Sequence, residues 1–206
     1  MLAHRTTARI VIAATAALGL LTACDGSGGS GGQAPAGGAA SEAPALRRTD
    51  APPSRAHNDS DVMFARMMIP HHLQAVQMAE LAATRAEDPE VKKLAERIRA
   101  AQEPEVAAMR GWLQAWGMPE STRGHMRHGM PGMLSADDLQ DLEAVSGEIF
   151  DKEFLRLMIA HHEGAVTMAQ RERREGESAD AKGLAQSIET SQRDEIEQMR
   201  RILDRL

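Results

Sequence analysis

The chain has 206 residues and a formal net charge of −6, with one cysteine, 13 methionines and no tyrosine. This negative balance, without any cluster of basic residues, argues against nucleic acid as a partner. The single cysteine excludes an internal disulfide, and its position at 24 leaves the rest of the chain without a thiolate for catalysis or metal binding.

The first 23 residues have the features of an export signal. Basic residues precede an apolar run at 10–21, which is too short for an ordinary membrane-spanning helix and is typical of a signal peptide. The run ends in Leu-Thr-Ala-Cys at 21–24, which resembles the lipobox of bacterial lipoproteins. That pattern implies cleavage before Cys24 and lipid attachment to it, so we expect an exported protein anchored on the outer face of the cell membrane. The alternative is a plain secretory signal with an incidental cysteine.

Residues 24–58 are rich in Gly, Ser, Ala and Pro and predict a flexible tether between the lipid and the folded domain. Residues 59–206 are long enough for one compact domain. Its first helix is expected to begin at Ser60, as N-cap, and to run to about Ala86. Pro70 lies inside this helix and should kink it just before His71.

The second helix should open at Asp88-Pro89, with aspartate as the cap and proline in the first turn. Ser135 to Asp138 resembles a capping box and predicts a short helix that ends near Gly147. A long helix follows from about Glu148 to Glu175, and Ser178 should cap the last one. No stretch has convincing β alternation, so we predict an all-α fold, an antiparallel four-helix bundle.

Two segments ninety positions apart are near-copies of each other. DVMFARMMIPHHLQAVQMA at 61–79 and DKEFLRLMIAHHEGAVTMA at 151–169 agree at eleven of nineteen positions without a gap. The same offset pairs residues further along the chain, among them Glu105 with Glu195. A constant offset predicts a tandem duplication of a helical hairpin, with copies at 60–116 and 148–206 joined by a loop and short helix at 117–147.

Polar residues interrupt the apolar stripe that should face the core of each copy. The predicted stripes contain Asp61, Phe64, Met68, His72, Ala75, Ala79 and Ala82 on the first helix, and Leu94, Ile98, Ala101, Glu105, Met109 and Trp112 on the second. The polar residues at or beside the stripes are His71, His72, Gln102, Glu105, His161, His162, Gln192 and Glu195. Buried polar groups need partners. Either the glutamates bond the histidines and hold the bundle together, or some of these side chains bind a metal and the others orient the ligands.

Without cysteine in the domain, soft-metal chemistry must use methionine sulfur and histidine nitrogen. Met68 and His72 are four residues apart and can share one ion, as can Met158 and His162, so that a set of two histidines and two methionines would suit monovalent copper or silver. The candidate metal ligands are Met68, His71, His72, Met78, Met158, His161, His162 and Met168, with Gln102, Glu105, Gln192 and Glu195 as orienting residues or alternative ligands. No organic cofactor is indicated.

The loop between the copies holds a second set of candidate ligands. Histidines and methionines recur between 124 and 133, at His125, Met126, His128, Met130 and Met133. Tracts of this composition in exported proteins are typical of copper-handling segments. The alternative is a methionine-rich plug that folds over the end of the bundle, and both interpretations can hold together.

Three motifs together resemble a known bacterial family, domain of unknown function 305. They are the doubled Met-Ile-x-His-His-x-x-Ala-Val-x-Met-Ala segment, the Gly-Met-Pro-Gly-Met-Leu-Ser run at 129–135, and Phe150-Asp151-x-x-Phe154, and the resemblance covers 59–206. It implies a ferritin-like four-helix bundle, usually exported, with no established enzymatic activity and with relatives linked to copper binding or tolerance. The family's motif residues fall on the same eight methionines and histidines.

The chain departs from the di-iron ferritin pattern, because it contains no Glu-x-x-His. An iron oxidase or oxygenase is therefore disfavoured, and a metalloenzyme ranks last among the functions considered. We expect a membrane-tethered, extracytoplasmic protein that binds, buffers or transfers copper. The alternative is a non-catalytic structural module of the cell envelope, whose partner would be another envelope protein or a second copy of the chain.

Overall fold

A computed structural model describes residues 56–120 and 130–206. The expected signal peptide, Cys24, nearly all of the tether, and His125, Met126 and His128 lie outside these residues. Within them the chain forms five helices and no strand: α1 (Asp59–Arg85), α2 (Pro89–Ala115), α3 (Ala136–Ala144), α4 (Gly147–Glu175) and α5 (Ala179–Arg205). The all-α prediction is confirmed. No helix in the described part is long and apolar enough to cross a membrane.

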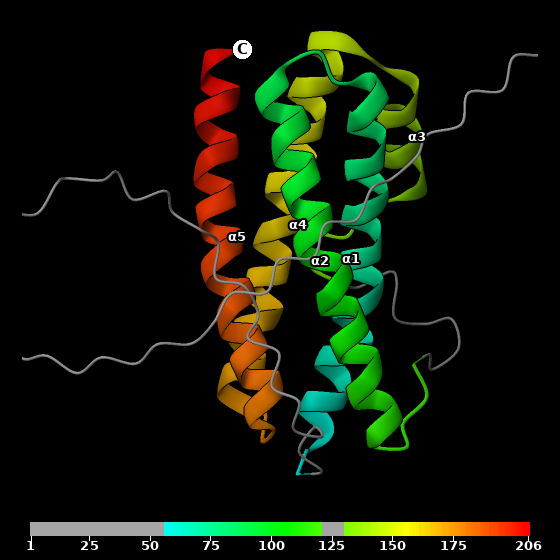
Figure 1. The fold of residues 1–206 in the computed structure, drawn as a ribbon, viewed down its shortest axis with the longest axis vertical. Coiled ribbons are helices and arrows are strands. Elements are labelled where there is room, and N and C mark those ends of the chain that lie inside the picture. The colour runs from blue at the N-terminus through cyan, green and yellow to red at the C-terminus, as the bar shows by residue number, and fades with distance from the viewer. Residues whose placement is uncertain (1–55, 121–129) are drawn as a thin grey trace, which may run out of the picture. The chain divides into compact units, whose positions relative to one another are not determined.

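The four long helices run side by side as two hairpins (Figure 1). α1 packs along α2, α4 packs along α5, and the two hairpins meet mainly between α1 and α4. The short α3 contacts α4. The bundle thus has its central contact between the two helices that carry the His-His pairs.

Two apolar clusters fill the core. The first combines the beginning of α1, including Met68, with the end of α4, including Met168. The second combines the end of α1, including Met78, with the beginning of α4, including Met158. Because the beginning of each of these helices packs with the end of the other, α1 and α4 are antiparallel. The residues between the two clusters are the polar ones, so a polar layer divides the core.

The predicted inward stripe of α1 is buried from Asp61 to Ala82, as its helical phase requires. On α2 one prediction was wrong: Ala101 is exposed and the neighbouring Gln102 is buried. The inward row on α2 continues from Ile98 by four residues to Gln102, which turns Ala101 toward solvent. Pro70 lies inside α1, as expected, and Pro104 lies inside α2.

The cap of α1 lies two residues before the predicted one. Asn58 accepts hydrogen bonds from the backbone N–H groups of Ser60 and Asp61, at 2.9 and 3.2 Å, and the Asp61 carboxylate accepts one from the Asn58 N–H. This reciprocal box places Ser60 inside the first turn. The caps at Asp88, Ser135 and Ser178 are confirmed. The short helix α3 ends at Ala144 rather than near Gly147, because Gly147, at φ 67°, already opens α4.

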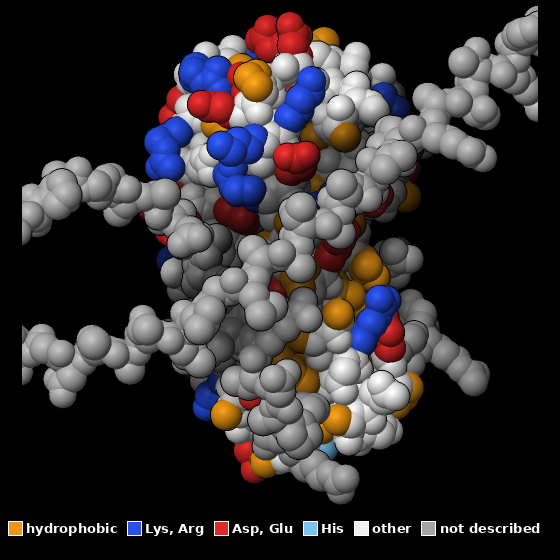
Figure 2. Space-filling model, in the orientation of Figure 1, with side chains coloured by type: hydrophobic (Ala, Val, Ile, Leu, Met, Phe, Trp, Pro, Cys, Tyr) orange, Lys and Arg blue, Asp and Glu red, His pale blue; other side chains and the backbone are white. Residues whose placement is uncertain are grey.

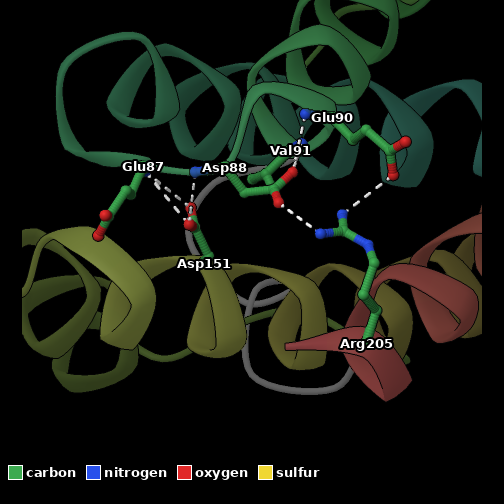
Figure 3. A network of polar contacts seen from close by, with 6 residues as sticks. All are labelled: Glu87, Asp88, Glu90, Val91, Asp151 and Arg205. Carbon is green, nitrogen blue, oxygen red and sulfur yellow. Dashed lines mark hydrogen bonds and ion pairs between the residues drawn. The ribbon is translucent and has the colours of Figure 1, made fainter.

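Two aspartates at matched positions tie the hairpins together. Asp61, at the start of α1, accepts hydrogen bonds from the backbone N–H groups of Glu177 and Ser178 in the α4–α5 turn, at 3.1 and 2.9 Å. Asp151, near the start of α4, accepts from the N–H groups of Glu87 and Asp88 in the α1–α2 turn (Figure 3). We call these two contacts the aspartate clasps. Each hairpin thus anchors the turn of the other.

A buried glutamate distinguishes the Asp61 clasp from the Asp151 clasp. Glu172 of α4 is 1% exposed and hydrogen-bonds the Asp61 carboxyl group. Burial, followed by the bond to Asp61, raises the pKa of Glu172 to about 8, while hydrogen bonds keep the pKa of Asp61 low against the effect of its burial. The pair therefore shares one proton at neutral pH, held by Glu172. The matched position in α1 is Ala82, so the other clasp has no such pair.

The surface carries charges of both signs, and Figure 2 shows them intermixed over the upper part of the face that is drawn. Several are paired, such as Arg205 with Asp88 at 2.9 Å (Figure 3) and Arg200 with Glu163 at 2.8 Å. Exposed ion pairs each contribute little to the free energy of folding. The stability of the bundle must therefore come mainly from the two apolar clusters and from how the polar layer is satisfied.

Candidate metal centre

The polar layer brings together side chains from all four long helices. His71, His72 and His162 have no exposed surface, His161 is 1% exposed, and Gln102 and Gln192 are 2% and 3% exposed. Glu105 is buried and Glu195 is partly exposed. All eight polar residues that the sequence placed at the inner faces thus lie between the two apolar clusters.

Each hairpin contains one buried histidine–glutamate pair. The Nε2 atom of His72 lies 2.7 Å from the Glu105 carboxylate, and the Nε2 atom of His162 lies 2.7 Å from the Glu195 carboxylate. A carboxylate only accepts, so Nε2–H is the donor, and in a neutral ring the lone pair then lies on Nδ1. Neither Nδ1 atom has a partner among the described residues.

The other two histidines meet at the centre of the bundle. The rings of His71 and His161 lie against each other, with their centroids 3.7 Å apart and their planes tilted by 33°. His71 donates from Nε2 to the Pro131 carbonyl at 3.1 Å, which again leaves a lone pair on Nδ1, and neither ring nitrogen of His161 has a partner in the described part. Burial, and next the neighbouring His72, lowers the pKa of His71 to about 3, and burial and His71 lower the pKa of His161 far below its ordinary value. Both rings are therefore neutral at physiological pH.

A short segment after the interhelical loop holds His71 in place. Its residues 130–134 cross α1 and α4 at the polar layer, where Gln74 donates to the Leu134 carbonyl at 3.0 Å and accepts from its N–H at 2.8 Å. Close approach to α4 requires glycine on both sides. Gly132 has φ 75° and a Cβ there would lie 2.6 Å from the Ala160 carbonyl oxygen, while a Cβ on Gly164 would overlap the Pro131 carbonyl.

This packing accounts for the Gly-Met-Pro-Gly-Met-Leu-Ser run. The described part of the loop lies against the middle of the bundle, so a plug over the bundle end is wrong for residues 130–134. Met130 is buried at 6% exposure and Met133 is partly buried. The Pro131 carbonyl was missed from the sequence, because a backbone oxygen has no side-chain signature; the glycines that let it approach are its only signal.

The methionines flank the polar layer from both sides. Met68 and Met168 belong to the first apolar cluster, together with Met109, and Met78 and Met158 belong to the second, together with Met199. The antiparallel arrangement thus pairs Met68 with Met168 and Met78 with Met158, rather than Met68 with Met158. Each side of the histidine layer has one candidate sulfur ligand from each hairpin.

The donor set fits a soft ion better than a hard one. In the part of the chain that the structure describes, no three His, Cys, Asp or Glu side chains gather closely enough to hold a metal. Both glutamates in the layer are already bonded to histidines. What remains is imidazole nitrogen and thioether sulfur, the ligands that monovalent copper and silver prefer.

Fold and layer together define an all-helical bundle protein with a buried histidine layer between methionine-bearing clusters. The chain belongs to the family described as Domain of unknown function (DUF305), whose sequence profile matches residues 61–203. A search of curated proteins gave no match.

Several solved structures are similar to this one over most of their length. A DUF305 protein from Streptomyces coelicolor is 34% identical with a TM-score of 0.67, covering 71% of this chain and 93% of its own. A DUF305 fragment from Deinococcus radiodurans is 33% identical with a TM-score of 0.67, covering 72% and 98%. CopM in its Cu(I)-bound form is 38% identical with a TM-score of 0.61, covering 70% and 96%, and CopM has also been solved with Cu(II) and with silver.

Proposed function

We propose that this protein binds monovalent copper in the polar layer of its bundle and buffers or transfers the ion outside the cell membrane, to which a lipid on Cys24 tethers it. The observation that carries the proposal is the set of buried Nδ1 atoms of His71, His72 and His162, which have no hydrogen-bond partner among the described residues. A buried polar atom without a hydrogen-bond partner costs free energy. The same atom lacks a partner at the matched positions of both hairpins, which calls for an explanation. A metal ion bound by these nitrogen atoms would explain it.

The residues around these nitrogens suit the metal. Nε2–H bonds to Glu105, Glu195 and the Pro131 carbonyl fix the tautomer, so the lone pair stays on the nitrogen that would bind. The apolar clusters on both sides exclude water and hard ions, and Met68, Met78, Met158 and Met168 offer thioether sulfur. The copper- and silver-bound forms of CopM support the same choice of ion.

The test compares two variants by anaerobic titration with Cu(I) against a chromogenic chelator. The bundle variant combines Met68→Leu and Met158→Leu with His72→Gln and His162→Gln; glutamine keeps an N–H for each glutamate but removes the imidazole lone pair. We expect this variant to lose tight Cu(I) binding while its helical circular dichroism persists.

The matched control replaces His125, Met126 and His128 and keeps Met130 and Met133, which pack with the segment that holds His71. It should lose only weaker equivalents, because the ligands of the bundle are already positioned. Zinc at equal concentration is the second control, because thioether sulfur contributes little to zinc sites. Loss of all copper from the loop variant, with none lost from the bundle variant, would contradict the proposal.

The second candidate function is a structural or interaction module of the envelope. It is favoured by the two 2.7 Å histidine–glutamate pairs, in which each side chain is the other's partner. Metal content after purification separates the two, because a purely structural layer would retain no stoichiometric copper.

A further inference from the structure

Sulfur atoms gather a second time, on the surface of the bundle where α1 meets α4. A groove of about 310 Å³ is lined there by Met63 and Met67 of α1, Met168 of α4 and Pro131. Met63 is 40% exposed, and only Leu73 and Ile149 are comparably exposed large apolar side chains in the described chain. Exposed methionine on a charged surface brings no packing benefit, which suggests another use for its sulfur.

The three methionines line the groove from two helices. Met63 and Met67 are four residues apart and therefore lie on the same face of α1. Met67 packs against the first apolar cluster, and Met168 is a member of that cluster from α4. Methionine has three rotatable bonds, so its sulfur can turn toward a common ion with little strain.

The charges around the groove select the kind of ion. Arg171 at the rim is bonded to Glu175 at 2.7 Å, and Glu172 is bonded to Asp61, so each glutamate is already engaged by another side chain. The exposed Arg174 adds positive charge, which opposes a divalent ion more than a monovalent one. Neutral thioethers beside a cationic rim favour a soft monovalent ion over calcium, zinc or divalent copper.

The groove leads directly to the polar layer. Pro131 lines it, and the carbonyl of the same residue accepts the hydrogen bond from His71. Met168 lies both in the groove and six residues from His162 on α4. Pro131 is thus shared between the groove and the central histidines.

We propose that Met63, Met67 and Met168 form an outer, thioether-only site for a monovalent soft metal ion, and that this ion passes from there to the histidine layer. The outer site is inferred only from the residues that line the groove. The passage of the ion rests in addition on the copper-binding function proposed above.

The outer site is tested with silver nitrate, in chloride-free buffer, added to the full-length chain in detergent with methionine methyl groups labelled with carbon-13. We expect the methyl signals of Met63, Met67 and Met168 to shift together. The variant Met63→Leu with Met67→Leu, which preserves apolar volume, should lose one silver equivalent. The matched control Met109→Leu with Met118→Leu, outside the groove, should lose none. Unshifted methyl signals, or equal silver stoichiometry in both variants, would overturn the outer site.

The same samples separate this proposal from the proposed function. With His72→Gln and His162→Gln, the groove signals should still shift even though the tight Cu(I) site is lost. Suppose that the methyl signals of the groove methionines shift, but that neither the wild type nor the histidine variant binds Cu(I) tightly. The outer site would then be supported, and the proposed copper binding by the histidine layer would be wrong. The same double variant, Met63→Leu with Met67→Leu, also tests the passage of the ion. Its histidine layer should bind Cu(I) several-fold more slowly than that of the wild type and reach the same final occupancy. An unchanged rate of binding would overturn the passage.

Discussion

At the scale of single residues, the orientation of each imidazole is set by what accepts its Nε2–H. For His72 and His162 this is a carboxylate, and for His71 it is a backbone carbonyl. A side chain that can rotate freely must lose entropy to bind an ion, whereas these rings are already positioned. The acceptors therefore matter as much for a metal site as the rings themselves.

The buried Glu172 makes stability depend on pH in a direction opposite to that of the histidines. Its folded pKa of about 8 lies above the ordinary 4.5, so its contribution is complete below pH 4.5 and is lost as the pH rises toward and through 8. His71, with a folded pKa of about 3 against 6.5, contributes stability above pH 6.5 that is lost as the pH falls toward 3.

We expect Glu172→Gln to remove the alkaline loss, because glutamine copies the protonated acid and can still donate to Asp61. At pH 9 the variant should be more stable than the wild type by up to about 5 kcal/mol, because a pKa raised from 4.5 to about 8 corresponds to about 1.4 kcal/mol for each unit. At pH 5 the two should be nearly equal. Urea denaturation at both pH values measures the difference. Equal stabilities at pH 9 would show that Glu172 is not buried as a shared-proton partner of Asp61.

At the scale of elements, the segment 130–134 is the part of the chain between the hairpins that reaches the polar layer. Gly164→Ala adds a methyl group that overlaps the Pro131 carbonyl, so this segment must move and His71 must lose its acceptor. We expect a destabilisation of about 1–3 kcal/mol, the usual cost of a buried donor left without a partner.

Gly183→Ala is the matched control, since Gly183 lies inside α5 with nothing within 4 Å of an added Cβ. Alanine is the better helix former, so this control should be neutral or more stable. Thermal unfolding of both variants measures the contrast. If Gly164→Ala were as stable as the control, the close packing of the segment on α4 would be wrong.

The helices themselves could be predicted from the sequence, because cap residues and the spacing of apolar residues are local signals. The inward face of α1 was correct for every predicted residue, and so were the caps at Asp88, Ser135 and Ser178. Asn58 was missed since Ser60 is an equally good cap by type, and only the reciprocal bond with Asp61 decides between them.

The contacts between elements were harder to predict. The grouping of Met68 with Met168, rather than with Met158, depends on the direction in which α1 and α4 cross, and sequence spacing within one helix does not contain that information. Glu172 was missed for a similar reason: it lies beyond the repeated segment, and its partner Asp61 comes from the other hairpin.

At the scale of the whole molecule, the proposed tether makes a prediction about where the bundle works. If Cys24 carries the lipid, Cys24→Ser should abolish incorporation of a radiolabelled fatty acid and release the protein from the membrane fraction. A diacylated cysteine supplies two chains, which suffices for stable attachment where one chain is marginal. Cell fractionation checks the outcome, and an unlabelled wild type whose serine variant stays with the membrane would contradict the anchor.

The aspartate clasps have a consequence for how the bundle comes apart. Asp61 bonds the turn of the second hairpin, and Asp151 bonds the turn of the first. A hairpin that begins to melt therefore withdraws a carboxylate from its neighbour and uncovers backbone N–H groups there, which costs the intact half free energy. Neither half retains its own full set of bonds alone, so the two hairpins should unfold in one cooperative transition rather than in sequence.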